Sequence, residues 1–190
     1  MIERLVKRLL TITLTLLFIG CAHPINIAPM SHSEKTKPTS TKKVGYVISG
    51  VDKARQITTA GGGGDKVTYY PYRDLEKAIR EALTSVYTEV NALNSASDAS
   101  GGVSLIFIPS ISTVSKSESM LTWPPTHFYI DLSCDVLDTS GNLVESFKVS
   151  SDGYAEYSEF KQDPGLAGQR AATNLITKLR QAIISNDKLK

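Results

Sequence analysis

Hydrophobic and polar residues alternate along several stretches of the chain, with the two-residue period that predicts half-buried β-strands. The clearest case is Thr126–Leu137. Its apolar face carries Phe128, Ile130, Leu132, Cys134 and Val136, and its polar face carries His127, Tyr129, Asp131, Ser133 and Asp135. Such a strand belongs in an antiparallel sheet with one face toward the core and the other toward water. Less regular patterns predict four more strands, at Val44–Val51, Lys66–Tyr70, Val103–Val114 and Leu143–Tyr157.

Two further stretches have apolar residues at the spacing of an amphipathic helix. Leu75–Ala92 follows Asp74, which can cap its start, and Leu166–Ser185 follows the start signal Asp163-Pro164. The order of these elements favours an α+β fold, in which two helices pack on one face of a mostly antiparallel sheet.

Glycine and proline mark the connections between the predicted elements. The run Gly61–Gly64 lacks the spacing of a phosphate-binding loop, because Asp65 separates it from Lys66 and a strand follows. We therefore expect a flexible hairpin tip that joins two strands. Pro109 predicts an edge position for its strand, or a bulge just after it. Asp138–Asn142 predicts a hairpin turn.

The first twenty residues have the composition of an export signal. Arg4, Lys7 and Arg8 precede the uncharged, largely apolar run Leu9–Ile19, and Gly20-Cys21 follows at once. A basic start, a short apolar run and a small residue at the cleavage site are the parts of a secretory signal peptide. The run is shorter than the roughly 20 apolar residues that a membrane-spanning helix needs.

The cysteine gives this signal a second meaning. Phe18-Ile19-Gly20-Cys21 resembles the bacterial lipobox, with Phe18 in place of the usual Leu. The resemblance implies cleavage between Gly20 and Cys21 and acylation of Cys21, whose lipid chains would anchor the mature protein to a membrane. In enterobacterial sorting, Asp after this cysteine retains a lipoprotein at the inner membrane. Ala22 occupies this position here, which implies that the mature protein is sorted to the periplasmic face of the outer membrane.

Two alternatives to the lipid anchor remain open. One is an ordinary signal peptide with an incidental cysteine, and the other is an uncleaved anchor helix. The preferred interpretation divides the chain into three parts. Residues 1–20 are the signal peptide, residues 21–43 are the lipidated cysteine with a flexible tether rich in Pro, Ser and Thr, and residues 44–190 are a single periplasmic domain.

The charge balance argues against one class of partner. The chain has 21 Lys and Arg and 19 Asp and Glu, and the signal peptide contains three of the basic residues and one of the acidic ones. The mature chain is therefore neutral, without the basic excess of a nucleic-acid-binding protein.

Candidate chemistry is sparse. Cys134 stands on the apolar face of its strand, which predicts a small, buried core residue. No spacing of His, Cys, Asp or Glu indicates a metal ion, a cofactor or a catalytic set, so we expect a protein that is not an enzyme.

One short motif suggests a binding surface. Trp123, Pro124 and Pro125 stand together between two predicted strands. Trp123 either folds back onto the core as a lid or stands out as an interface anchor, since Trp is enriched at binding hot spots. Tyr129, on the polar face of the next strand, completes this candidate interface.

The layout, together with the lipobox, resembles the YajG-like periplasmic lipoproteins. The matching stretches are Val44–Val51, Lys66–Thr68 with Pro71–Leu75, Phe128–Val136, the turn at Gly141-Asn142, and the last helix from Ala171. More distantly, the fold resembles the periplasmic domains of CsgG- and PelC-type lipoproteins, which assemble into rings for export across the outer membrane.

Three functions follow from these observations. The first is an outer-membrane-anchored, non-enzymatic interaction or accessory module of the cell envelope, with a protein partner. The second, implied by the distant resemblance, is a homo-oligomeric ring subunit of an envelope export or assembly complex. The third is a lipoprotein that binds a small ligand or glycan, with Trp123, Tyr129 and Gly61–Gly64 as the rim of its site.

Overall fold

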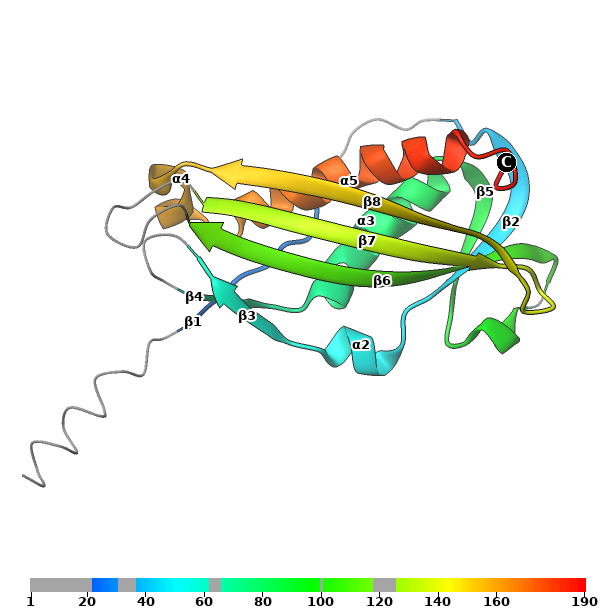
Figure 1. Cartoon of the computed structure of the whole chain (residues 1–190), viewed down its shortest axis with the longest axis horizontal. Coiled ribbons are helices and arrows are strands. Elements are labelled where there is room, and N and C mark those ends of the chain that lie inside the picture. The colour runs from blue at the N-terminus through cyan, green and yellow to red at the C-terminus, as the bar shows by residue number, and fades with distance from the viewer. Residues whose placement is uncertain (1–21, 31–36, 62–65, 100, 118–125) are drawn as a thin grey trace, which may run out of the picture.

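The computed structural model describes residues 22–30, 37–61, 66–99, 101–117 and 126–190 (Figure 1). Its main sheet has five strands in the order β5-β2-β6-β7-β8. β2 runs parallel to β5 and β6, whereas β6, β7 and β8 are antiparallel to one another. The strands are β2 (Ser40–Val47), β5 (Tyr87–Leu93), β6 (Val103–Ser117), β7 (Thr126–Leu137) and β8 (Leu143–Ala155).

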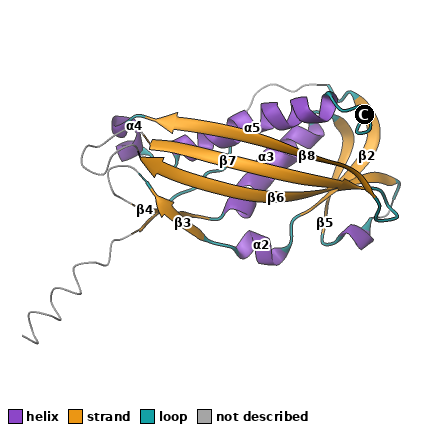
Figure 2. Cartoon of the chain, in the orientation of Figure 1, coloured by secondary structure: helices purple, strands orange, loops and turns teal. Residues whose placement is uncertain are grey.

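Two long helices lie together on one face of this sheet (Figure 2). They are α3 (Pro71–Thr84) and α5 (Leu166–Ile184), and they also pack against each other. Their buried apolar residues form one core with the inner face of the sheet, where Phe128, Ile130 and Leu132 of β7 are almost fully buried. The predicted α+β class, with two helices on one face of a mostly antiparallel sheet, is confirmed. Among the described residues, no helix is long and apolar enough to cross a membrane.

Backbone contact fixes how closely α5 approaches the sheet. Gly153 of β8 faces this helix, and a Cβ atom there would collide with the carbonyl oxygen of Ala167. The missing side chain lets the helix backbone lie directly on the strand, a close approach that only glycine permits.

A second, smaller sheet forms beside the first, in the order β1-β4-β3. Its strands are β1 (Ala22–Pro24), β4 (Lys66–Tyr69) and β3 (Ile57–Ala60). β3 and β4 are antiparallel on either side of the glycine run, as a hairpin tip requires, although residues 62–65 lie outside the described part. The Tyr69 ring packs edge-on against Phe128, and its hydroxyl shares a 2.9 Å hydrogen bond with Thr113.

The segment after Cys21 differs from the flexible tether that the sequence predicts. Ala22–Pro24 pairs with β4, and the Ile25 amide donates to the Thr68 carbonyl at 2.9 Å. Ile27 is fully buried against Gly168 of α5, where a Cβ would collide with it. The Met30 amide donates to Thr173 at 3.1 Å. Residues 22–30 are therefore part of the folded domain, because burial of Ile27 and the added strand hold them in place.

The predicted helix Leu75–Ala92 is wrong in its second half. α3 begins earlier, at Pro71, and ends at Thr84, whose hydroxyl donates to the carbonyls of Arg80 and Glu81. The chain then turns and forms β5, parallel to β2. Tyr87, Thr88 and Val90 are aromatic or β-branched residues that favour a strand. Val86 and Val90 continued the helical spacing by coincidence.

Besides β1 and β5, four short elements were not predicted: α2 (Gly50–Ala54), β3, the 3-10 helix η1 (Ala96–Asp98) and α4 (Tyr157–Gln162). α2 and α4 follow the ends of β2 and β8, which is why these strands stop before the predicted Val51 and Tyr157. Glu156 begins α4 through a reciprocal capping box with Glu159. The predicted strand Thr126–Leu137 is confirmed at both ends.

The strand that contains Pro109 is not an edge strand, because β6 lies between β2 and β7. The pairing of β6 with β2 nevertheless ends at Phe107, and Pro109 comes two residues later. Its missing N–H therefore lies where β2 no longer requires a donor. The predicted turn at Asp138–Asn142 is present, since the Asp138 carboxylate accepts from the amides of Ser140 and Asn142.

We expect the packing of the N-terminal segment to contribute measurably to stability. Ile27→Ala should lower the free energy of unfolding by about 3 kcal/mol, because it removes a fully buried side chain and leaves a cavity. Urea unfolding followed by circular dichroism measures this change. Val51→Ala, at a 79% exposed position, is the matched control and should have little effect. Equal unfolding midpoints for Ile27→Ala and the unaltered protein would show that residues 22–30 are not held by the domain.

Candidate functional site

The face of the main sheet that points away from α3 and α5 is the candidate interaction surface. Alternate residues of β6, β7 and β8 point to this side, which we call the open face. Among them are Val114, Lys116, His127, Tyr129, Asp131, Ser133, Asp135, Ser146, Lys148, Ser150, Asp152 and Tyr154. Val114 is 48% exposed, which is high for a β-branched residue in a sheet.

Aromatic side chains gather at one end of the open face. The strand register places Lys116, His127 and Tyr154 in one row across β6, β7 and β8, and Tyr129 follows in the next row. The rings of His127 and Tyr129 are stacked with centroids 6.2 Å apart, and His127 and Tyr154 are 5.0 Å apart. The ammonium group of Lys116 lies 4.9 Å from the Tyr129 ring centroid. We call these four residues the aromatic cluster.

The rest of the open face is largely polar, and several of its side chains form hydrogen bonds with one another. The hydroxyl of Ser146 donates to Asp135 at 2.6 Å, and the hydroxyl of Ser150 donates to Asp131. Each pair joins β7 to β8 directly across the ladder. These carboxylates therefore serve the cross-strand pairing of the sheet.

The sequence-predicted interface is only partly within the described structure. Tyr129 lies on the open face, as its alternation predicts. Trp123, Pro124 and Pro125 lie outside the described residues, as do Gly20 and Cys21.

Lys116 and Tyr154 were not singled out from the sequence, although they complete the cluster around Tyr129. Lys116 was missed because the predicted strand ended at Val114, whereas β6 continues to Ser117. For Tyr154, the signal is the hairpin turn, from which the register of β7 and β8 can be counted. The register shifts by one residue between Val136 and Leu137. This shift places Tyr154 opposite His127 and leaves Gly153 to face α5.

Cys134 is a core residue, as predicted. It is 3% exposed, and burial raises the pKa of its thiol to about 12. A thiol in this state is a poor nucleophile, because the reactive species is the thiolate. Among the described residues, no group of three or more His, Cys, Asp or Glu side chains is placed to hold a metal ion.

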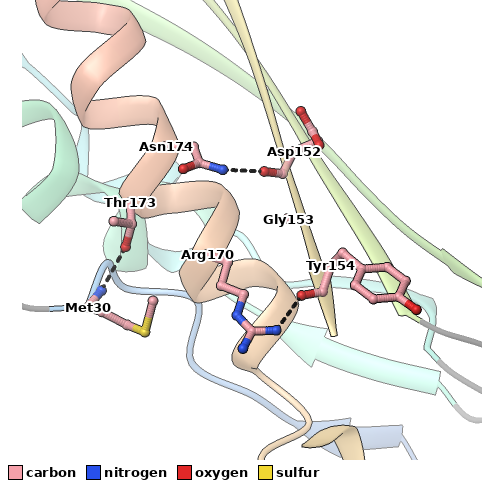
Figure 3. Close-up of a pocket in the computed structure, with 7 residues that line it drawn as sticks. All are labelled: Met30, Asp152, Gly153, Tyr154, Arg170, Thr173 and Asn174. Carbon is pink, nitrogen blue, oxygen red and sulfur yellow. Dashed lines mark hydrogen bonds between the residues drawn. The ribbon is translucent and has the colours of Figure 1, made fainter. Parts of the chain in front are cut away.

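A shallow pocket lies at the outer edge of β8, against α5 (Figure 3). Its polar groups are used within the protein. Arg170 donates to the Tyr154 carbonyl at 2.7 Å, and Asn174 donates to the Asp152 carbonyl at 2.9 Å. Arg170 also holds both carboxylate oxygens of Glu159, each at 2.8 Å, and this pairing lowers the Glu159 pKa to about 2. One turn further along α5, Lys178 donates to the Ser150 carbonyl at 2.9 Å.

The pocket is therefore the outer border of an edge strand whose outward carbonyls are capped by side chains. Successive caps are four residues apart on α5 and two residues apart on β8. These steps match in length, since four helical residues rise about 6 Å and two strand residues about 6.7 Å. Capping of this kind protects a sheet edge from unwanted strand pairing.

Fold and surface together define an α+β domain with a mixed sheet, two helices on one face and a partly exposed aromatic cluster on the other. The structure is similar to that of protein XCC0632 from Xanthomonas campestris, which is described as DUF330. The TM-score is 0.50 at 11% sequence identity, over 87% of this chain and 98% of that protein. At this identity, the similarity shows a shared fold.

Two further solved structures match with lower scores. A minor lipoprotein from Acinetobacter baumannii has a TM-score of 0.48 at 12% identity, over 76% of this chain and 94% of its own. A putative lipoprotein from Caulobacter crescentus has a TM-score of 0.33 at 11% identity, over 58% of this chain and 81% of its own. No protein-family model matches the sequence, and no curated protein matches it.

The thiol of Cys134 should resist labelling in the folded protein. At about pH 8 a maleimide should modify it only after denaturation, because burial excludes the reagent and keeps the thiol protonated. Mass spectrometry before and after denaturation measures the modification. Ser133→Cys places a thiol on the adjacent open-face position and should react without denaturant. Rapid labelling of Cys134 in the native protein would contradict the buried assignment.

The Glu159–Arg170 pair should make stability depend on pH in the acid range. The Glu159 pKa falls to about 2 in the folded state from an ordinary value of 4.5. Its contribution is therefore complete above about pH 4.5 and is lost as the pH falls toward 2. Glu159→Gln should reduce the loss of stability on acidification, measured as the urea midpoint at about pH 6 and about pH 3 against the unaltered protein. An identical pH dependence in both proteins would show that the pair contributes nothing.

Proposed function

We propose that this chain is a lipoprotein, anchored through Cys21 to the periplasmic face of the outer membrane, that acts as a non-enzymatic interaction module of the cell envelope. The observation that carries this proposal is the aromatic cluster on the open face of the sheet. Protein interfaces are enriched in aromatic residues, and a tyrosine often supplies a large share of the binding energy. The partner that fits this surface is a protein of the same compartment.

The anchor is supported by the sequence. A basic start, a short apolar run and Gly20-Cys21 form the lipobox-like signal, and Ala22 favours outer-membrane sorting. Anchoring would confine the protein to one surface, where a binding module meets its partner at high effective concentration.

The non-enzymatic role is supported by how the described polar groups are used. Asp131 and Asp135 accept from serines of β8, Glu159 is held by Arg170, and the Cys134 thiol is buried. Each of these groups has a structural task that accounts for its position.

Site-specific photo-crosslinking in cells tests the binding surface. A photo-reactive amino acid at the position of Tyr129 should give a discrete crosslinked product with a second protein. The same amino acid at the position of Gln181, exposed on α5 in the opposite layer, is the control and should give none. Once the partner is identified, Tyr129→Ala should weaken its binding roughly tenfold, since hot-spot residues contribute more than about 1 kcal/mol.

The anchor provides the second control for this experiment. Cys21→Ser removes the acylated side chain, and the crosslinked product should be lost with it. Ladders of self-crosslinked chains would favour the homo-oligomeric ring instead. Equal crosslinking from positions 129 and 181, or none from position 129, would overturn the open face as the binding surface.

A further inference from the structure

The first residues after Cys21 are packed into the domain, and this fixes which end of the molecule lies next to its anchor. We propose that the end formed by β1, β3, β4 and α4, called here the anchor end, rests on the phospholipid surface that holds the Cys21 lipid. Tyrosine and lysine side chains of this end would lie among the headgroups. The inference rests on the proposed lipid anchor and adds an orientation to it.

The connection between the lipidated residue and the folded domain is short. Ala22 is paired with Lys66 in the small sheet, and one peptide unit, about 3.8 Å between Cα atoms, links it to Cys21. The next residues are also held in place, because the Ile25 amide is hydrogen-bonded to β4 and Ile27 is buried against α5. A lipid on Cys21 therefore draws the tip of the small sheet to the membrane surface.

The same segment connects the small sheet to the beginning of α5. Gln169 donates to the Asn26 carbonyl at 3.4 Å, and a Cβ at Gly165, in the junction between α4 and α5, would be 2.6 Å from the Asn26 oxygen. Figure 1 shows α4 and the small sheet at one end of the long axis, and β2, β5 and the C-terminus at the other. Anchoring at β1 therefore brings α4 toward the bilayer as well.

The side chains described at this end suit a bilayer surface. α4 carries the exposed Lys161 and the partly exposed Tyr157, with the ammonium group 5.5 Å from the centre of the ring. Lys66 is exposed at the start of β4. Tyrosine is enriched where a membrane meets water, and lysine extends its ammonium group to the headgroups along an apolar stem.

Among the described residues of the anchor end, most acidic side chains are paired with other groups of the protein. Glu159 is paired with Arg170, and Asp163 accepts from Gln169 at 2.9 Å. Glu156 is exposed and accepts from the Tyr154 hydroxyl. Among the described residues of β1, β3, β4 and α4 with its N-cap, two exposed lysines thus face the phospholipid surface with one exposed glutamate, so lipid phosphate groups are the matching chemistry.

The long strands lead away from this surface. β7 starts at the anchor end and extends about 40 Å over its 12 residues to the Asp138–Asn142 turn. The two ends of the strand are therefore at different depths, which provides a direct test.

The test uses the full-length, lipidated protein in vesicles of phosphatidylethanolamine and phosphatidylglycerol. A polarity-sensitive fluorophore is attached through Ser158→Cys in α4 or Ser140→Cys in the turn, both exposed positions. The buried Cys134 does not compete for the label. We expect a blue shift, and quenching by brominated lipids, for the label at position 158, and emission as in buffer for the label at position 140.

A charge reversal tests the chemistry of the contact. Lys161→Glu should reduce the blue shift and quenching at position 158. Lys190→Glu makes the same change at the far end and should leave them unchanged. Mass spectrometry of the N-terminal peptide reports separately whether Cys21 carries lipid.

The outcomes separate the two proposals. A lipidated chain whose label at position 158 stays in water, or whose label at position 140 is quenched, would overturn the orientation and leave the proposed function intact. Equal effects of Lys161→Glu and Lys190→Glu would overturn the assigned lysine contact. An unmodified Cys21 would overturn the lipoprotein itself, and the orientation with it.

Discussion

The close approach of α5 to the sheet is the constraint on which the rest of the molecule depends. Gly153 lets the helix backbone lie directly on β8, and Gly168 lets Ile27 pack directly against the helix backbone. One helix therefore covers the inner face of β7 and β8, caps the outer edge of β8 and holds the N-terminal segment. If α5 stood further out, its side chains at positions 170, 174 and 178 would lose the β8 carbonyls, and Ile27 would lose its place in the core.

The elements that could be predicted are those whose pattern is long and whose packing agrees with it. β7 alternates over 12 residues, and both its ends and its inner face were correct. α3 was misjudged because apolar residues kept a helical spacing past Thr84, while the main sheet offered Tyr87–Leu93 a parallel partner in β2. β1 is three residues long, and Ile25 and Ile27 are too few to form a periodic signal. Their burial depends on α5 and β4, far along the chain.

The residues of the candidate site also differ in whether the sequence could predict them. Tyr129 was found because alternation alone assigns it to the open face. Lys116 was missed because the predicted strand ended at Val114, whereas β6 continues to Ser117. The position of Tyr154 beside His127 depends on the register of β7 and β8, which a one-residue irregularity near Val136 alters. A local deviation at one end of a hairpin thus decides which residue of β8 lies opposite His127 at the other end, about 30 Å away, and the alternation of a single strand does not contain that information.

The capped edge of β8 also limits the symmetry that this protein can adopt. A ring built by extending one continuous sheet needs two complementary edges on every subunit, so that each copy is both donor and acceptor. On β8, the carbonyls of Ser150, Asp152 and Tyr154 already accept from α5. Strand addition at that edge would first have to break these bonds. Copies that met through the other edge of the main sheet, β5, would pair about a two-fold axis and stop at a dimer, so a larger ring could not be built by extending the main sheet alone.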